Sequence, residues 1–321
     1  MPSWSAEVVR LYVKYIRCSK QINGNAQNMR NSIHDLYVHP GSFCPPTNHG
    51  HDIIVEREDF NDWPLYRVSF QSPLGKNRGA GQQCAMLYIH GGAFYREIDP
   101  NHWKFIFQTA RETGLDVFVP IYPLIPRPAA TANQVIPGLV NICHHIKQDI
   151  VNITGDSAGG GMALATMHHM LDVAPALAKK VKSVVLISPV LDCTFSHPEA
   201  LRLDKFDPWL GIDGLQVITP LWSAGISTSN CLASPLYGDI TRLPPLLLLC
   251  GTDDLLNADA RRLNAKFQGK DCSQCVSGSA QLERFTYIEQ PSMIHVYPLL
   301  PHWEGRQARS LIMEFIQSHL T

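Results

Sequence analysis

Residues 153–164 read ITGDSAGGGMAL and place one serine among small residues. The apolar run before them is typical of a strand, and residues 158–173 have the length and composition of a helix. The segment GDSAG at 155–159 fits G-x-S-x-G, a sharp strand-to-helix turn that exposes its serine at the edge of a sheet. Glycines two residues away let strand and helix come close. The alternative is a glycine-rich turn in which Ser157 only caps the helix.

Working outward, short apolar segments alternate with helix-length segments. The predicted strands are 65–70, 84–90, 115–122, 149–154, 182–189, 244–251 and 284–289, and the predicted helices are 101–113, 131–148, 158–173, 257–268 and 302–320. This alternation predicts an α/β fold, with a mostly parallel sheet covered by helices on both faces. Two regions interrupt it, at about 1–50 and 192–235. We expect one domain over 1–321, in which these two regions form a helical cap.

Composition limits the functional classes. Hydrophobic residues make up 45% of the 321 residues, charged residues 17%, and the net charge is −1. Nucleic acid is therefore not an expected partner, and no apolar run is long enough for stable membrane insertion. Nine scattered cysteines and the lack of an export signal favour the cytoplasm. A homodimer is left open. The basic amphipathic stretch at 8–17 is expected to be a cap helix folded onto the core.

A serine nucleophile needs donors for a developing oxyanion, and the sequence offers them after the predicted strand at 84–90. Gly91 and Gly92 lack side chains, so their N–H groups can approach a substrate oxygen closely. Together with the N–H of Ala158 they are the predicted oxyanion hole. The preceding His90 is expected to hold this loop rather than to act as a base. The alternative is that the His-Gly-Gly segment at 90–92 is an ordinary turn with no catalytic role.

The nucleophile also needs a base and an acid, which follow it along the chain in this type of fold. Three histidines follow the last candidate acid, and His295 lies in the loop after the predicted strand at 284–289, where the base is expected; His302 and His319 are the others. For the acid we predict Asp253, the first carboxylate after the strand at 244–251. Asp254 and Asp259 are its competitors.

Taken in order, the motifs HGGAF, GDSAGGGMAL, SPVLD, FDPWL, LPPLLLLCGTDDLL and IHVY resemble those of the hormone-sensitive-lipase-like family of α/β-hydrolases. The resemblance runs from about residue 84 to 298. It implies an α/β-hydrolase fold, a triad of Ser157, Asp253 and His295, oxyanion donors at Gly91, Gly92 and Ala158, and a cap. It also implies hydrolysis of carboxylic esters through an acyl-serine, with a small-molecule ester as partner. Short acyl groups, from acetyl to about hexanoyl, are expected because the sequence shows no evident interfacial segment.

Other chemistries are less well supported by the sequence. Cys272 and Cys275 form C-x-x-C, but no second pair completes a zinc site, and no metal or organic cofactor is expected. The same residues could serve a lactonase, a thioesterase, an acyltransferase, or a non-hydrolytic C–C bond or cyclisation enzyme. A small-molecule receptor on this fold is a further alternative. Retention of His295 argues against it, because receptors of this family have lost the triad histidine.

Overall fold

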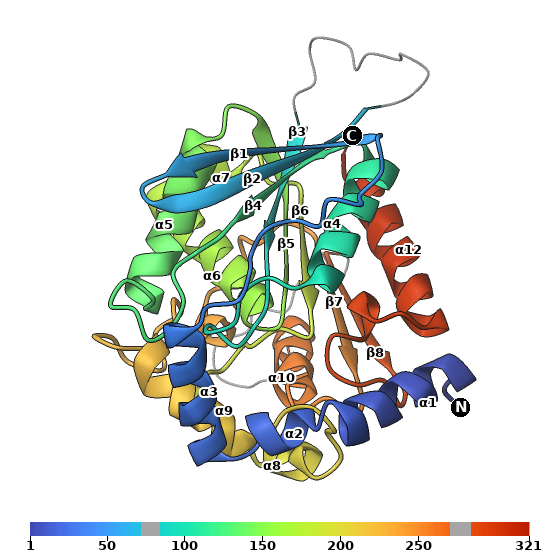
Figure 1. Ribbon diagram of the computed structural model, residues 1–321. Coiled ribbons are helices and arrows are strands. Elements are labelled where there is room, and N and C mark those ends of the chain that lie inside the picture. The colour runs from blue at the N-terminus through green and yellow to red at the C-terminus, as the bar shows by residue number, and fades with distance from the viewer. Residues whose placement is uncertain (72–83, 270–283, 321) are drawn as a thin grey trace.

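The structure is a computed structural model that describes residues 1–71, 84–269 and 284–320 (Figure 1). Its centre is an eight-stranded sheet in the order β1-β2-β4-β3-β5-β6-β7-β8. The strands are β1 (Ile53–Phe60), β2 (Trp63–Phe70), β3 (Cys84–Ile89), β4 (Asp116–Pro120), β5 (Asp149–Asp156), β6 (Ser183–Ile187), β7 (Leu246–Gly251) and β8 (Phe285–Gln290). β2 pairs antiparallel with β1 and β4, and all other pairs are parallel. The predicted α/β-hydrolase fold class is confirmed.

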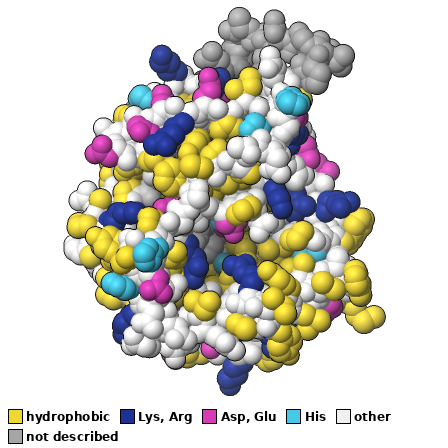
Figure 2. Space-filling view, viewed as in Figure 1, with side chains coloured by type: hydrophobic (Ala, Val, Ile, Leu, Met, Phe, Trp, Pro, Cys, Tyr) yellow, Lys and Arg dark blue, Asp and Glu magenta, His cyan; other side chains and the backbone are white. Residues whose placement is uncertain are grey.

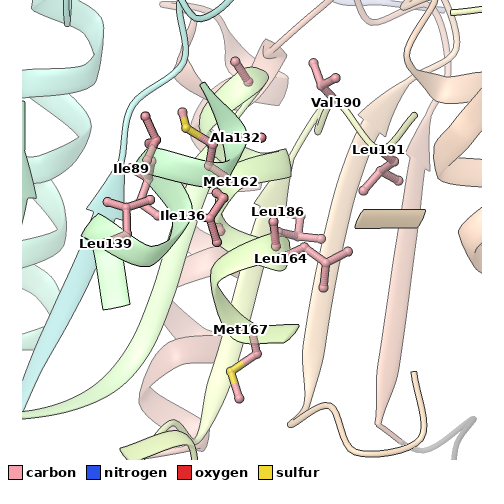
Figure 3. Packing of buried hydrophobic residues seen from close by; sticks show 14 of the residues in the cluster. Ile89, Ala132, Ile136, Leu139, Met162, Leu164, Met167, Leu186, Val190 and Leu191 are labelled. Atoms are coloured by element: carbon pink, nitrogen blue, oxygen red, sulfur yellow. The ribbon is translucent and has the colours of Figure 1, made fainter. Parts of the chain in front are cut away.

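Helices cover both faces of the sheet (Figure 1). α4 (Pro100–Thr113) and α12 (Trp303–Ser318) lie on one face, and α5 (Ala132–His145), α6 (Ala158–Val173) and α10 (Asn257–Phe267) lie on the other. The strands alternate between them: Leu186 of β6 belongs to the core with α5 and α6, whereas its neighbours Val185 and Ile187 belong to the core with α4 and α12. Figure 3 shows Leu186 among residues of α5 and α6, including Ile136 and Met162.

The first strand, β1, was not among the sequence predictions. Its sequence, IIVEREDF, is mostly polar after the first three residues, and most of its side chains are exposed. β1 lies at the sheet edge and pairs only with β2. An edge strand with exposed faces lacks the apolar run by which buried parallel strands are recognised.

The two irregular regions meet over the carboxyl ends of the parallel strands. The first contains α1 (Trp4–Leu11), the π-helix η1 (Tyr12–Ile16), α2 (Ser19–Asn23) and α3 (Ala26–Val38); the second contains α8 (Pro198–Asp204) and α9 (Ile212–Trp222). α3 packs on α9, and Lys20 of α2 binds the carbonyl and carboxylate of Asp204. The remaining short helices are α7 (Pro175–Ala178), η2 (Pro235–Tyr237) and η3 (Tyr297–Leu299).

The basic stretch at 8–17 is helical, but only one of its sides is packed. Ala6 and Val13 are buried against the body of the protein. The opposite side is apolar and faces solvent, which the sequence reasoning did not anticipate. No helix in the described part of the chain has the length and hydropathy of a membrane span.

Candidate active site

Ser157 lies at the turn between β5 and α6, in a backbone conformation that L-residues rarely adopt. Its φ is 53° and its ψ is −121°. The turn is held by hydrogen bonds from the Ser157 N–H to the Ile187 carbonyl (2.8 Å) and from the Val190 N–H to the Ser157 carbonyl (2.9 Å). A Cβ on Gly159 would lie 2.0 Å from the Ile89 carbonyl oxygen, so only glycine fits there. The surrounding structure maintains this strained backbone conformation. The conformation directs the Ser157 hydroxyl away from the sheet.

The Ser157 hydroxyl meets the predicted base. Its Oγ lies 2.9 Å from Nε2 of His295, which accepts the hydroxyl proton when the ring carries its own proton on Nδ1. His295 comes from the loop between β8 and η3, as the sequence predicted. Both side chains are buried, so few water molecules compete for this hydrogen bond.

The predicted acid partner, Asp253, is wrong, and its neighbour Asp254 occupies that position. Asp254 Oδ2 accepts the Nδ1–H of His295 at 3.0 Å, and Asp254 is fully buried. Asp253 instead binds Arg10 of α1. The reason is the path of the chain after β7: it turns at Thr252 and Asp253, and the Asp253 N–H bonds to the Met293 carbonyl (3.0 Å). This turn leaves the carboxylate of Asp253 beside Arg10 and places that of Asp254 beside His295.

The other competitors have structural partners away from Ser157. Asp259 binds Arg262 at 2.7 Å, within the same helix α10. His302 caps α12, because its Nδ1 accepts the Gly305 N–H at 3.0 Å. His319 lies at the end of α12, with Nδ1 2.7 Å from the Phe315 carbonyl oxygen.

The predicted oxyanion donors are brought to Ser157, with one correction. The N–H of Gly91 donates to Asp156 Oδ1 at 3.0 Å, so it is not free for a substrate oxygen. The N–H groups of Gly92, Ala93 and Ala158 donate to no acceptor among the described residues. Gly92 and Ala93 line the same cavity as Ser157. The carboxylate of Asp156 thus occupies the N–H of Gly91, whereas the N–H groups of Gly92, Ala93 and Ala158 remain candidate donors for a substrate oxygen.

A buried network around Asp156 fixes this loop. Besides Gly91, the Asp156 carboxylate accepts the hydroxyl of Tyr88 (2.6 Å) and lies 3.1 Å from Nε2 of His102. Burial disfavours the charged ring of His102, but Asp156 and Asp99 favour it and raise the pKa of His102 to about 10. The sequence reasoning assigned no role to Tyr88 or His102. The signal available in the sequence was Asp156 itself, a charged residue inside an elbow motif of small residues.

His90, which was predicted to hold the glycine loop, is enclosed within it. Its Nδ1 lies 2.6 Å from the Gly91 carbonyl oxygen, and its ring stacks on that of Tyr122 at a centroid distance of 4.5 Å. Burial, followed by the nearby charge of His102, lowers the pKa of His90 to about 4. A neutral ring bound in this way supports the loop.

A second buried carboxylate, Asp207, lies beside the acid–base pair. Its Oδ1 accepts the N–H groups of Trp209 (2.7 Å) and Leu210 (2.9 Å), and its Oδ2 accepts that of Leu255 (2.9 Å), the residue after Asp254. Burial, and then the charge of Asp254, raises the pKa of Asp207 to about 6. Asp207 therefore connects the 192–235 region to the loop of Asp254. The sequence showed it only as part of the motif FDPWL.

The electrostatics of His295 combine opposing effects. Burial disfavours the protonated ring, whereas the charge and hydrogen bond of Asp254, and then the charge of Asp207, favour it. The net result is a His295 pKa above its ordinary value. The indole of Trp209 also meets the imidazole edge-on, at a centroid distance of 5.8 Å and an angle of 84°. The ring is thus held in one orientation between Ser157 and Asp254.

A cavity of about 380 Å³ opens onto this arrangement. Its floor includes Ser157 and His295. Its walls come from both irregular regions, among them Arg17 and Met29 of the first and Trp209 of the second. Figure 2 shows a hollow near the centre of this face, with basic side chains at its rim.

No metal-binding cluster of three or more His, Cys, Asp or Glu side chains occurs in the residues that the structure describes. Cys272 and Cys275 lie outside those residues.

The comparisons with known proteins agree with this geometry. A family model described as "alpha/beta hydrolase fold" matches residues 86–297. The chain belongs to this family of α/β-hydrolases, which confirms the membership that the motifs predicted. A solved esterase from the bacterial hormone-sensitive lipase family has the same fold, with a TM-score of 0.73, 24% identity and full coverage of both chains.

Two curated relatives carry enzyme names. A triacylglycerol lipase of Mycobacterium tuberculosis is 32% identical over 223 residues, which is 68% of this chain but only 43% of that protein. An acetyl-hydrolase of Streptomyces hygroscopicus is 28% identical over 240 residues, covering 73% of this chain and 75% of that protein. The chain thus matches less than half of the mycobacterial lipase.

Proposed function

We propose that this protein is a serine carboxylic-ester hydrolase in which Ser157, His295 and Asp254 form the catalytic triad. The observation that supports this most directly is the chain of hydrogen bonds from Ser157 Oγ through the imidazole of His295 to Asp254, at the floor of a cavity. This is the arrangement by which an otherwise weak hydroxyl becomes a nucleophile.

The acylation step uses the geometry as follows. His295 Nε2 takes the proton of Ser157 as Oγ forms a bond to the ester carbonyl carbon, and the carbonyl electron pair moves to its oxygen. The N–H groups of Gly92, Ala93 and Ala158 are placed to bind that oxyanion. Asp254 stabilises the charged imidazole. The intermediate then collapses, the C–O bond to the alcohol breaks, and the alcohol leaves with the proton from Nε2.

Deacylation repeats the step with water. His295 takes a proton from water as its oxygen attacks the acyl carbon, and the Ser157 oxygen leaves with that proton. The products are a carboxylic acid and the free enzyme. No step requires a group other than the chain, its substrate and water.

Short acyl groups, from acetyl to about hexanoyl, are the proposed substrates. A cavity of about 380 Å³ is near the lower end of the ordinary range for ligand pockets, roughly 300 to 1,000 Å³. The relative named acetyl-hydrolase fits this preference. The two irregular regions act as the cap in this proposal. The proposed compartment is the cytoplasm, and the free state of the seven described cysteines fits a reducing environment.

The test is covalent labelling. Wild-type protein is treated with a fluorophosphonate and analysed by intact mass, alongside hydrolysis of p-nitrophenyl esters of increasing acyl length. We expect one adduct, its absence in Ser157→Ala, and the highest kcat/KM for the shorter esters. Labelling that persists in Ser157→Ala, or a wild-type protein that hydrolyses no ester, would overturn the proposal.

A further inference from the structure

The outer side of α1 and η1 carries the densest group of exposed large apolar side chains in the described chain. Trp4 is 82% exposed, Tyr15 62% and Ile16 72%. With three more exposed residues they follow the helical spacing i, i+4, i+7, i+8, i+11 and i+12, which places them on one side: Trp4, Val8, Leu11, Tyr12, Tyr15 and Ile16. We call this set the outer stripe. A contiguous apolar face of this kind marks an interaction site.

The outer stripe has an exposed neighbour on another element. Trp303, at the start of α12, is 55% exposed, and its N–H donates to Ser5 Oγ of α1 at 3.1 Å. Figure 2 shows apolar side chains gathered over the region of α1. Tryptophan and tyrosine, with an apolar body and a polar tip, are the residues that favour the boundary between lipid and water.

Basic residues predominate in this region. Residues 4–34 contain one acidic residue, Glu7, and five Lys or Arg residues: Arg10, Lys14, Arg17, Lys20 and Arg30. Arg10 and Lys20 are paired with Asp253 and Asp204, but Lys14 and Arg17 form no ion pair with a described residue. Both are exposed beside the outer stripe. An apolar face flanked by basic groups is complementary to an anionic lipid surface.

We propose that the outer stripe docks the protein on an anionic lipid–water interface. The helix lies in the plane of the interface, with Trp4, Tyr15 and Ile16 among the acyl chains and Lys14 near the headgroups. This is adsorption to a surface and not insertion across it. A second copy of the chain fits the same face less well, because a two-fold contact pairs this basic surface with itself and brings together Lys14 and Arg17 of both copies, with only Glu7 on this helix to offset their charge.

The outer stripe lies close to the cavity of Ser157, and this position affects how substrate reaches the cavity. This part of the inference rests on the proposed ester hydrolysis. Arg17 directly follows η1 and lines the cavity of Ser157, and its guanidinium lies 4.9 Å from the centroid of the Trp209 ring. Docking on α1 therefore places the cavity close to the lipid surface. Short-acyl esters of hydrophobic alcohols, which concentrate at such surfaces, are the substrates this arrangement favours.

The experiment measures vesicle binding by flotation, using phosphatidylcholine vesicles with and without phosphatidylglycerol. The test variant is Trp4→Gln/Tyr15→Gln/Ile16→Gln. Its matched control is Val173→Gln, an exposed apolar residue (59%) at the far end of α6. Wild type and control should bind the anionic vesicles with equal affinity, and the triple variant should bind them at least about tenfold more weakly. Lys14→Gln should weaken binding about fivefold on anionic vesicles only. All variants should keep the wild-type kcat/KM for soluble p-nitrophenyl acetate.

Three results would overturn the proposal: wild-type protein that floats with neither vesicle, equal loss in Val173→Gln and the triple variant, or a wild-type dimer that the triple variant converts to monomers. Melting temperatures verify that each variant is folded. Absence of ester hydrolysis in wild-type protein that still binds vesicles would refute the proposed function and leave the docking surface standing.

Discussion

The turn at Ser157 and the loop after β7 both supply a residue to the candidate triad, yet they differ in what determines their shape. At Ser157 the shape is local: glycines at 155 and 159 allow a close approach that any larger side chain would block, and a five-residue pattern encodes it. After β7 the shape depends on a partner 40 residues away, because the carbonyl of Met293 holds the N–H of Asp253. A local pattern can be read from sequence, whereas a loop fixed by a distant segment cannot.

The largest expected effect tests the locally determined turn. Ser157→Ala removes the nucleophile while leaving the glycines that shape the elbow, so kcat should fall about 10⁶-fold with a melting temperature close to that of wild type. Stopped-flow and steady-state assays with a soluble aryl ester measure this loss of kcat. Gly159→Ala is the structural contrast, because its Cβ would lie 2.0 Å from a backbone oxygen, and it should lower stability as well as activity. A Ser157→Ala variant with substantial turnover would contradict the assignment.

The next effect distinguishes the two adjacent aspartates. Asp254→Asn should lower kcat by about 10⁴-fold, because an amide cannot accept the Nδ1–H in the same way and favours the wrong tautomer of His295. KM should change little, since Asp254 faces the imidazole and not the cavity. Asp253→Asn is the matched control in the same loop. An Asp254→Asn enzyme with nearly full kcat would show that the hydrogen bond to His295 is not catalytic.

The same contrast explains how much the sequence could predict. β3, β5, β6 and β7 are buried parallel strands with apolar runs, so their positions followed from composition. The edge strand β1 has no such run and was missed. Ser157 and His295 followed from a motif and from chain order. The acid did not, and neither did the loss of Gly91 from the oxyanion donors, because both depend on hydrogen bonds between distant segments: Met293 with Asp253, and Asp156 with Gly91.

A smaller effect concerns the pH dependence. His295 must be neutral to accept a proton, so kcat/KM should rise with pH through a pKa above the ordinary histidine value, because Asp254 and Asp207 favour the charged ring. Asp207→Asn removes one of these charges, which lowers the pKa of His295 and moves the acid limb of the profile to lower pH. It should also reduce kcat about tenfold, since an amide cannot accept all three N–H groups that Asp207 now binds.

The control for this prediction is Asp213→Asn, an exposed aspartate in the same 192–235 region. It should leave both the acid limb and kcat unchanged. If Asp207→Asn lowers kcat without moving the acid limb, Asp207 supports the loop but does not influence the charge of His295.

The smallest effect completes the comparison within the loop after β7. Asp253 is partly exposed and bonded to Arg10, so it ties α1 to the loop but does not contact His295. An ion pair of this exposure stabilises a protein by at most about 1 kcal/mol, because water and salt screen it. Asp253→Asn should therefore keep most of the kcat and lower the melting temperature by no more than about 3 °C. Arg10→Gln should give the same small change, and the double variant should be no less stable than either single one, since both remove one interaction. Thermal melts at low and high salt measure this, and the difference from wild type should shrink as salt rises. A loss of kcat in Asp253→Asn comparable to that in Asp254→Asn would show that both carboxylates serve His295, and the two neighbours would no longer differ.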